Sequence, residues 1–90
     1  MNYCTYIIES ELDGRYYVGQ SRDCSERLIA HNLGKSKSTR PYRPWHFMYV
    51  RGFETRSEAM KHEKYLKSFK KRMYLEKYIR EDERSNLVKL

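Results

Sequence analysis

The fold is decided near the amino terminus by two short segments, YCTYII (residues 3–8) and YYVG (residues 16–19). Both are rich in β-branched and aromatic residues, which favour β-strands. Asp13-Gly14 between them favours a turn with positive φ, so we predict an antiparallel hairpin. Side chains alternate along a strand, so Cys4, Tyr6 and Ile8 should share one face, and Tyr3, Thr5 and Ile7 the other. Whether Tyr6 and Tyr17 share a face depends on the hairpin register, which the sequence leaves open.

A helix, a loop and a further strand should follow the hairpin. The residues from Asp23 to Glu26 resemble a capping box and predict a helix that runs to about Asn32. Gly34 should end this helix in the left-handed conformation. Residues 35–44 are polar and basic with two prolines and predict a loop. Residues 45–50 form a nearly continuous apolar run, which is typical of a central strand covered on both faces.

A second helix should begin at Thr55, which forms a complete capping box with Glu58. The basic run at residues 70–72 predicts a break before a last helix over residues 74–80. We therefore expect one domain, residues 1–80, followed by a charged and frayed tail, residues 81–90. The core stripe of the second helix is predicted to contain Ala59, Leu66, Phe69 and Met73.

Composition limits the classes of function. The chain has 90 residues and a net charge of +7, and its calculated pI is about 9.5. This excess of positive charge suits a polyanion such as nucleic acid, although a merely basic protein would show it too. Cys4 and Cys24 lack metal-ligand spacing, so we interpret both as reduced packing residues. No apolar run is long enough to span a membrane, and no signal peptide is evident, which predicts a cytoplasmic protein associated with the nucleoid.

Tyr6 and Tyr17 are the first candidate catalytic residues. Considered alone, they are two packing residues among nine tyrosines. They flank Gly19, however, whose missing side chain would let a substrate backbone come close. A phenol has a pKa near 10, so only about a thousandth of it is ionised at neutral pH. A tyrosine that activates water would need a nearby cation or a group that accepts its proton.

Arg27 and His31 are four residues apart and therefore lie on one helical face. An ordinary exposed charged face would give the same pattern. Alternatively, the guanidinium of Arg27 binds the scissile phosphate. His31 would then orient water, transfer a proton or contact phosphate.

Glu63 is the most informative single residue, because its position between Ala59 and Leu66 places it on the core-facing stripe. A lone carboxylate there costs several kcal/mol unless it is paired, protonated or bound to a cation. One alternative is a salt bridge with a basic neighbour, and another is that His62 turns inward instead. With a phosphate substrate, we favour a single Mg²⁺ or Mn²⁺ ion held by Glu63, because only one inward acid is evident.

A basic loop is the last candidate site. Its cations alternate with hydroxyl side chains, which suits contacts that position a nucleic-acid strand without reading its sequence. A solvated linker would have a similar composition, and so would the second cluster formed by Lys67 and residues 70–72. The residues we predict to bind nucleic acid are Lys35, Lys37, Thr39, Arg40 and Arg43.

Taken in order, these residues resemble the GIY-YIG nuclease superfamily. Cys4-Thr5-Tyr6 stands where the first triplet would be and Tyr17-Val18-Gly19 where the second would be, and Arg27, His31 and Glu63 follow in the family's order. The resemblance is closest to small single-domain bacterial members related to the amino-terminal domain of the excinuclease C subunit.

The resemblance implies an α+β fold, in which helices flank a three-stranded antiparallel sheet. It implies one divalent metal ion at Glu63, phosphate contact by Arg27, and a water-activating tyrosine at the position of Tyr17, supported by Tyr6. The chain departs from the pattern at Cys4, which replaces a glycine, and at Gln20, where a lysine would follow the second triplet. Asn86 is the only late candidate for the asparagine that some members place in the site.

Three functions remain in competition. The first is a metal-dependent endonuclease that hydrolyses branched, damaged or duplex DNA in repair or recombination, with a partner protein or domain that targets it. The second is a non-catalytic nucleic-acid-binding module of the same fold. The third is a protein-interaction domain whose charge is incidental, and it ranks last because it leaves Glu63 unexplained. None of the three involves a membrane.

Overall fold

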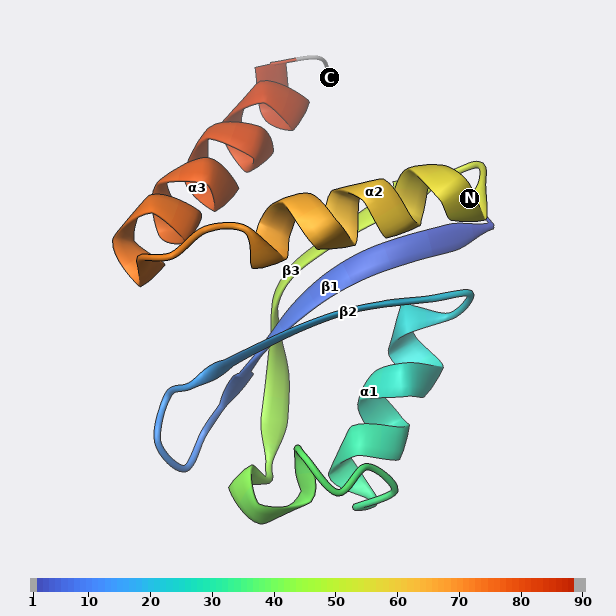
Figure 1. The fold of residues 1–90 in the computed structure, drawn as a ribbon, viewed down its shortest axis with the longest axis vertical. Coiled ribbons are helices and arrows are strands. Elements are labelled where there is room, and N and C mark those ends of the chain that lie inside the picture. The colour runs from blue at the N-terminus through green and yellow to red at the C-terminus, as the bar shows by residue number, and fades with distance from the viewer. Residues whose placement is uncertain (1, 89–90) are drawn as a thin grey trace.

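The computed structural model describes the backbone of residues 2–88 and the side chains of residues 2–84. A three-stranded antiparallel sheet of order β2-β1-β3 has helices on both faces, which confirms the predicted α+β fold (Figure 1). None of the described helices is long and apolar enough to cross a membrane. In chain order the elements are β1 (Tyr3–Ser10), β2 (Tyr16–Ser21), α1 (Cys24–Asn32), the 3₁₀ turn η1 (Arg40–Tyr42), β3 (Trp45–Phe53), α2 (Arg56–Lys67) and α3 (Arg72–Val88).

β1 is the central strand and contributes to two separate cores. Tyr6 and Ile8 point toward α1, while Ile7 points to the opposite face, which α2 and α3 cover. The alternation predicted from the sequence is therefore present. The buried members of the first core are Cys4, Tyr6, Ile8, Cys24 and Trp45. Those of the second are Ile7, Tyr49, Leu66, Leu75 and Ile79.

β3 lies at an edge of the sheet, so the prediction of a central strand was wrong. Ile8 pairs with Phe47 and Ile7 pairs with Tyr49, which leaves Met48 as an extra residue in a β-bulge. Because of the bulge, Phe47 packs against the core under α1 and Tyr49 joins the core under α2 and α3. The run of apolar residues in this strand contributes to the core under α1 at Phe47 and to the core under α2 and α3 at Tyr49.

Both predicted helix starts are confirmed. The Asp23 side chain accepts a hydrogen bond from the amide of Glu26 at the start of α1. Thr55 and Glu58 form a reciprocal capping box at the start of α2. Gly34 follows α1 with φ of +81°, the left-handed conformation expected of a glycine after a helix.

α3 is longer than the expected helix over residues 74–80. Its middle is held against the sheet by Asp82, which accepts a hydrogen bond from the Tyr49 hydroxyl at 2.7 Å and pairs with Arg51 at 3.2 Å. Met73 was wrongly assigned to the core. It is 65% exposed, because α3 begins at Arg72 after a break and turns Leu75 and Ile79 inward instead. The side chain of Asn86 lies outside the described residues.

Cys4 and Cys24 form a disulfide that joins β1 to the first residue of α1, with their Cα atoms 6.3 Å apart. The prediction of two reduced thiols was therefore wrong. A separation of 20 residues gives no sign that the two cysteines meet, because their contact follows from the return of α1 onto the sheet. The bond links the strand that carries Tyr6 to the helix that carries Arg27.

Candidate active site

The hairpin register brings Tyr6 and Tyr17 to the same face of the sheet. Tyr6 pairs with Gly19 and Ile8 pairs with Tyr17, so the two phenols are diagonal neighbours with ring centroids 6.4 Å apart. The space that Gly19 leaves is filled by the Tyr6 ring, because a Cβ atom at Gly19 would lie only 2.6 Å from Cζ of Tyr6. Gly19 therefore admits a tyrosine of the protein itself, and not a substrate backbone as we expected.

His31 is buried against the rings of Tyr6 and Tyr17 and connects them to the loop that contains Thr39. Its Nε2 lies 2.9 Å from the Tyr6 hydroxyl and its Nδ1 lies 2.7 Å from Oγ1 of Thr39. We assign the Tyr6 hydroxyl as a donor to Nε2, which leaves Nδ1–H to donate to Thr39. The Thr39 carbonyl in turn accepts a hydrogen bond from the Trp45 indole at 2.9 Å. With 2% of its surface exposed and both nitrogens engaged, His31 accepts a hydrogen bond from Tyr6 but cannot contact phosphate.

The electrostatics of this group favour neutral side chains. Burial raises the pKa of the Tyr6 phenol above its ordinary value, and the nearby charges of Tyr17 and Glu63 also raise it, whereas the Arg27 guanidinium lowers it. Burial, with a smaller contribution from Arg27, lowers the pKa of His31. His31 is therefore neutral at pH 7, with a free lone pair for the hydroxyl of Tyr6.

Arg27 lies one turn into α1 and is exposed. Its positive charge lowers the pKa of both Tyr6 and His31. It also lines a surface depression of about 230 Å³ together with His31 and Lys35. Arg27 thus connects the buried network to solvent, where a phosphate group can reach it.

Glu63 is partly covered, with 23% of its side chain exposed, and pairs with Lys67 at 3.2 Å. The salt bridge considered from the sequence is therefore present, but an exposed pair of this kind is weak and easily exchanged. The carboxylate is close enough to Tyr6 to raise the pKa of that phenol. His62 is the residue that turns toward the sheet, where it contacts Thr5 at 2.7 Å and Tyr78 at 2.8 Å.

Glu63 is the carboxylate that we predicted to hold a metal ion. Within the described part of the chain, no cluster of three or more His, Cys, Asp or Glu side chains is arranged to hold one. Mg²⁺ keeps several of its waters and often takes only one or two protein carboxylates, so Glu63 fits such an ion but would bind it weakly alone. The remaining ligands would have to be water and substrate phosphate.

The family model for the GIY-YIG catalytic domain matches residues 2–87, nearly the whole chain. The chain belongs to the GIY-YIG family. A UPF0213 protein from Streptococcus pneumoniae serotype 4 is 40% identical over 84 residues, which cover 92% of this chain and 83% of the relative. A UPF0213 protein from Staphylococcus saprophyticus is 38% identical over 71 residues, or 78% of this chain and 85% of the relative.

A solved structure supports the same assignment. The solution NMR structure of a UPF0213 protein from Bacillus halodurans is similar with a TM-score of 0.56 and 32% identity, and the match covers 88% of this chain and 83% of that one. The resemblance inferred from the two triplets is thus confirmed, and with it membership of a nuclease superfamily.

The basic loop of this GIY-YIG domain does not present a single surface. Lys35 and Lys37 are exposed, and Lys35 lies next to Arg27. Arg40 and Arg43 are exposed and line another depression, together with Asn32 and two prolines. Nε of Arg43 donates a hydrogen bond to the carbonyl of Arg40. Thr39 is only 1% exposed, so its hydroxyl serves His31 and is not available to nucleic acid as predicted. No spacing in the sequence signals this contact, because it joins a loop to a helix.

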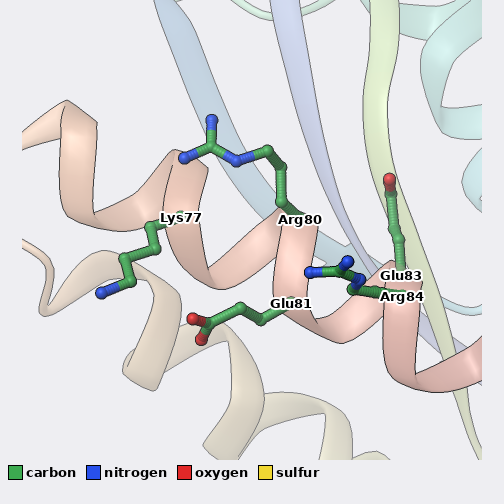
Figure 2. Close-up of a pocket in the computed structure, with 5 residues that line it drawn as sticks. All are labelled: Lys77, Arg80, Glu81, Glu83 and Arg84. Carbon is green, nitrogen blue, oxygen red and sulfur yellow. The ribbon is translucent and has the colours of Figure 1, made fainter.

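A shallow depression along α3 is separate from this group of residues. Its volume is about 470 Å³, and its lining carries both signs of charge (Figure 2). None of the tyrosine and histidine network lines it. The side chains that do are Lys77, Arg80, Glu81, Glu83 and Arg84. They provide positions for matched control variants.

Proposed function

We propose that the protein is a divalent-cation-dependent endonuclease that hydrolyses phosphodiester bonds in DNA. The observation that carries the proposal is the cluster of Tyr6, Tyr17 and His31, whose ring centroids lie 6.4, 5.9 and 5.1 Å apart, next to Arg27, which lines one depression with His31. The charges of Arg27 and Glu63 also act on the Tyr6 phenol, so groups from α1, α2 and β2 contribute to one site. The net charge of +7 adds a general attraction for a polyanion.

In this proposal Arg27 binds the scissile phosphate and stabilises the negative charge that develops on it. Tyr17 is partly exposed and, as the phenolate, would take the proton of the attacking water after its own proton has left to solvent, a loss that the positive charge of Arg27 and of a bound cation favours. Tyr6 and His31 hold the Tyr17 ring in position, with centroid separations of 6.4 and 5.1 Å. The neutral imidazole accepts a hydrogen bond from the Tyr6 hydroxyl, which fixes the Tyr6 ring beside Tyr17.

Glu63 would hold one Mg²⁺ or Mn²⁺ ion after release from Lys67. Such an ion supplies positive charge that stabilises a phosphate as it is attacked. Because one carboxylate binds Mg²⁺ weakly, we expect the site to be complete only when substrate phosphate is present. The free Lys67 ammonium would then lie near the same phosphate backbone, where its charge is favourable.

The second candidate is a nucleic-acid-binding module without catalysis. The observation in its favour is that Glu63 is already paired with Lys67, and that no cluster of three or more His, Cys, Asp or Glu side chains is arranged to hold a metal ion among the described residues. This module would bind DNA in a manner that weakens steeply with salt, and would leave every substrate intact.

One experiment separates the two. The purified protein is incubated with branched, damaged, single-stranded and duplex DNA, with Mg²⁺, with Mn²⁺ or with chelator. We expect cation-dependent cleavage that falls by more than about 100-fold in Glu63→Gln. The matched control is Glu81→Gln, an exposed carboxylate on α3 that should cleave like wild type. Equal cleavage by Glu63→Gln would remove the catalytic assignment, whereas binding without cleavage of any substrate would favour the module.

The substrate that is cut fastest would indicate the pathway. Preference for branched or damaged DNA would support a place in repair or recombination at the bacterial nucleoid. A domain with so little surface would gain affinity from a partner protein or domain, and we include such a partner in the proposal.

A further inference from the structure

A second depression beside Arg27 is otherwise lined by residues that were not predicted to belong to any site. It has a volume of about 300 Å³ and lies where the start of β1, the end of β2 and the start of α2 meet (Figure 1). Its lining consists of Tyr3, Gln20, Ser21, Arg22, Arg27 and Arg56.

Three arginine side chains line this one small volume, and its lining contains no acid. They come from the β2–α1 connection, from α1 and from α2, and none of them forms an ion pair with a described side chain (residues 2–84). Asp23 and Glu26 lie in the neighbouring depression, where Asp23 caps α1. The arginine charges therefore repel one another weakly, and a bound anion would reverse this effect.

Arg56 is the least expected of the three. It is the first residue of α2, where the helix dipole disfavours a cation. Its side chain is exposed, so it does not contribute to the core. Arg22 is exposed as well, and its guanidinium lies 5.9 Å from the centre of the Tyr3 ring, which keeps it over the depression.

Arg27 joins this depression to the rest of the candidate site. It also lines the depression beside His31 and Lys35, and a third one that contains Arg22 together with the acids Asp23 and Glu26. Cations therefore follow one another from Lys35 through Arg27 to Arg22 and Arg56. This is the arrangement expected for successive phosphates of one strand.

We propose that Arg22 and Arg56 bind a DNA backbone phosphate adjacent to the one held by Arg27, with the Gln20 amide as a further donor. The proposal rests on the proposed function of the same site. Planar guanidinium groups match phosphate oxygens bidentately, and an amide nitrogen adds a neutral hydrogen bond. A backbone contact of this kind positions the strand and carries no sequence preference.

The test compares two double variants with the same change in net charge. Arg22→Gln/Arg56→Gln alters the depression, and Arg80→Gln/Arg84→Gln alters exposed arginines on α3 (Figure 2). Fluorescence anisotropy with a labelled duplex, in chelator to prevent cleavage, gives the affinity from about 50 to about 200 mM salt. We expect the first variant to bind roughly tenfold more weakly, with a salt slope smaller by about 0.9, and the second to bind within about twofold of wild type. Equal weakening by both variants, or by neither, would overturn the proposal.

A scan with neutral methylphosphonate linkages locates the phosphate. At one linkage the difference in affinity between wild type and Arg22→Gln/Arg56→Gln should disappear, because the contact is already lost. If wild type and the double variant still differ in affinity at every linkage tested, Arg22 and Arg56 do not bind one particular phosphate. Failure of catalysis is recognised separately: wild type would then bind without cutting, while the two arginines still govern affinity.

Discussion

Replacement of Gly19 by alanine should both destabilise the protein and displace Tyr6. The added Cβ would lie 2.5 Å from the Tyr6 hydroxyl oxygen, 2.6 Å from Cζ and 3.0 Å from Cε1. The Tyr6 ring is 1% exposed, lies against Tyr17 and is hydrogen-bonded to His31, so it has little room to move.

The magnitude follows from the packing. Overpacking of a filled core costs about 1–3 kcal/mol, and a shift of the phenol would also weaken its hydrogen bond to His31, worth about 1 kcal/mol. A total of about 2–3 kcal/mol corresponds to a melting temperature lower by roughly 8 °C or more in a domain of this size. Since the same ring belongs to the proposed site, cleavage of DNA should fall together with stability.

Calorimetry or urea unfolding measures the loss, and a double-mutant cycle identifies its cause. Alanine at position 19 should cost little when Tyr6→Leu has removed the ring, which gives a coupling of about 1–3 kcal/mol between the two positions. If Gly19→Ala melts with wild type, or if its cost is the same with and without the Tyr6 ring, the explanation of this glycine is wrong.

Two further predictions concern stability. Burial lowers the pKa of both His31 and His62 in the folded protein, so the unfolded chain binds protons more readily. The free energy of unfolding should therefore be highest above pH ~6.5 and should decrease as the pH falls below that value. Melting temperatures measured between about pH 7 and pH 5 should show this decrease, and a smaller one in His31→Gln, whereas a constant melting temperature would contradict the prediction. Arg72 lies 3.7 Å from the centre of the Tyr16 ring, and its nitrogens bond Glu9 at 3.0 Å and Glu76 at 2.8 Å. Because the side chain is 48% exposed, Arg72→Met should lower the free energy of unfolding by only about 1 kcal/mol, and by less at high salt. Lys71→Met is the control. An equal loss of stability in both variants would show that the contacts of Arg72 with Tyr16, Glu9 and Glu76 are not the cause.

Local features of the fold could be predicted from the sequence because they depend on neighbouring residues. The caps at Asp23 and Thr55 need only a side chain and an amide three residues later. The two faces of β1 follow from simple alternation. Family membership was accessible for a similar reason, since the two triplets, Arg27 and Glu63 occur in a fixed order.

The remaining features depend on contacts between distant segments. The hairpin register that places the Tyr6 ring over Gly19 is a property of two strands together. Thr39 was expected at the surface, but the loop folds back and supplies its hydroxyl to His31. Arg22 and Arg56 carry no signal in the sequence, because they become neighbours only when α2 returns to the end of the sheet.

The bulge at Met48 means that β3 holds one residue more than its pairing with β1 requires. Deletion of that residue would leave Ile8 opposite Phe47 and Ile7 opposite Tyr49. Phe47 would still face the core under α1, Tyr49 would still face the core under α2 and α3, and the strand would lose its bulge. Deletion of a residue elsewhere in the strand would turn a polar side chain such as that of His46 toward one of the two cores, unless the β-bulge moved to a new position. Shortening of this strand by one residue, in nature or by design, should therefore be tolerated best at a single point.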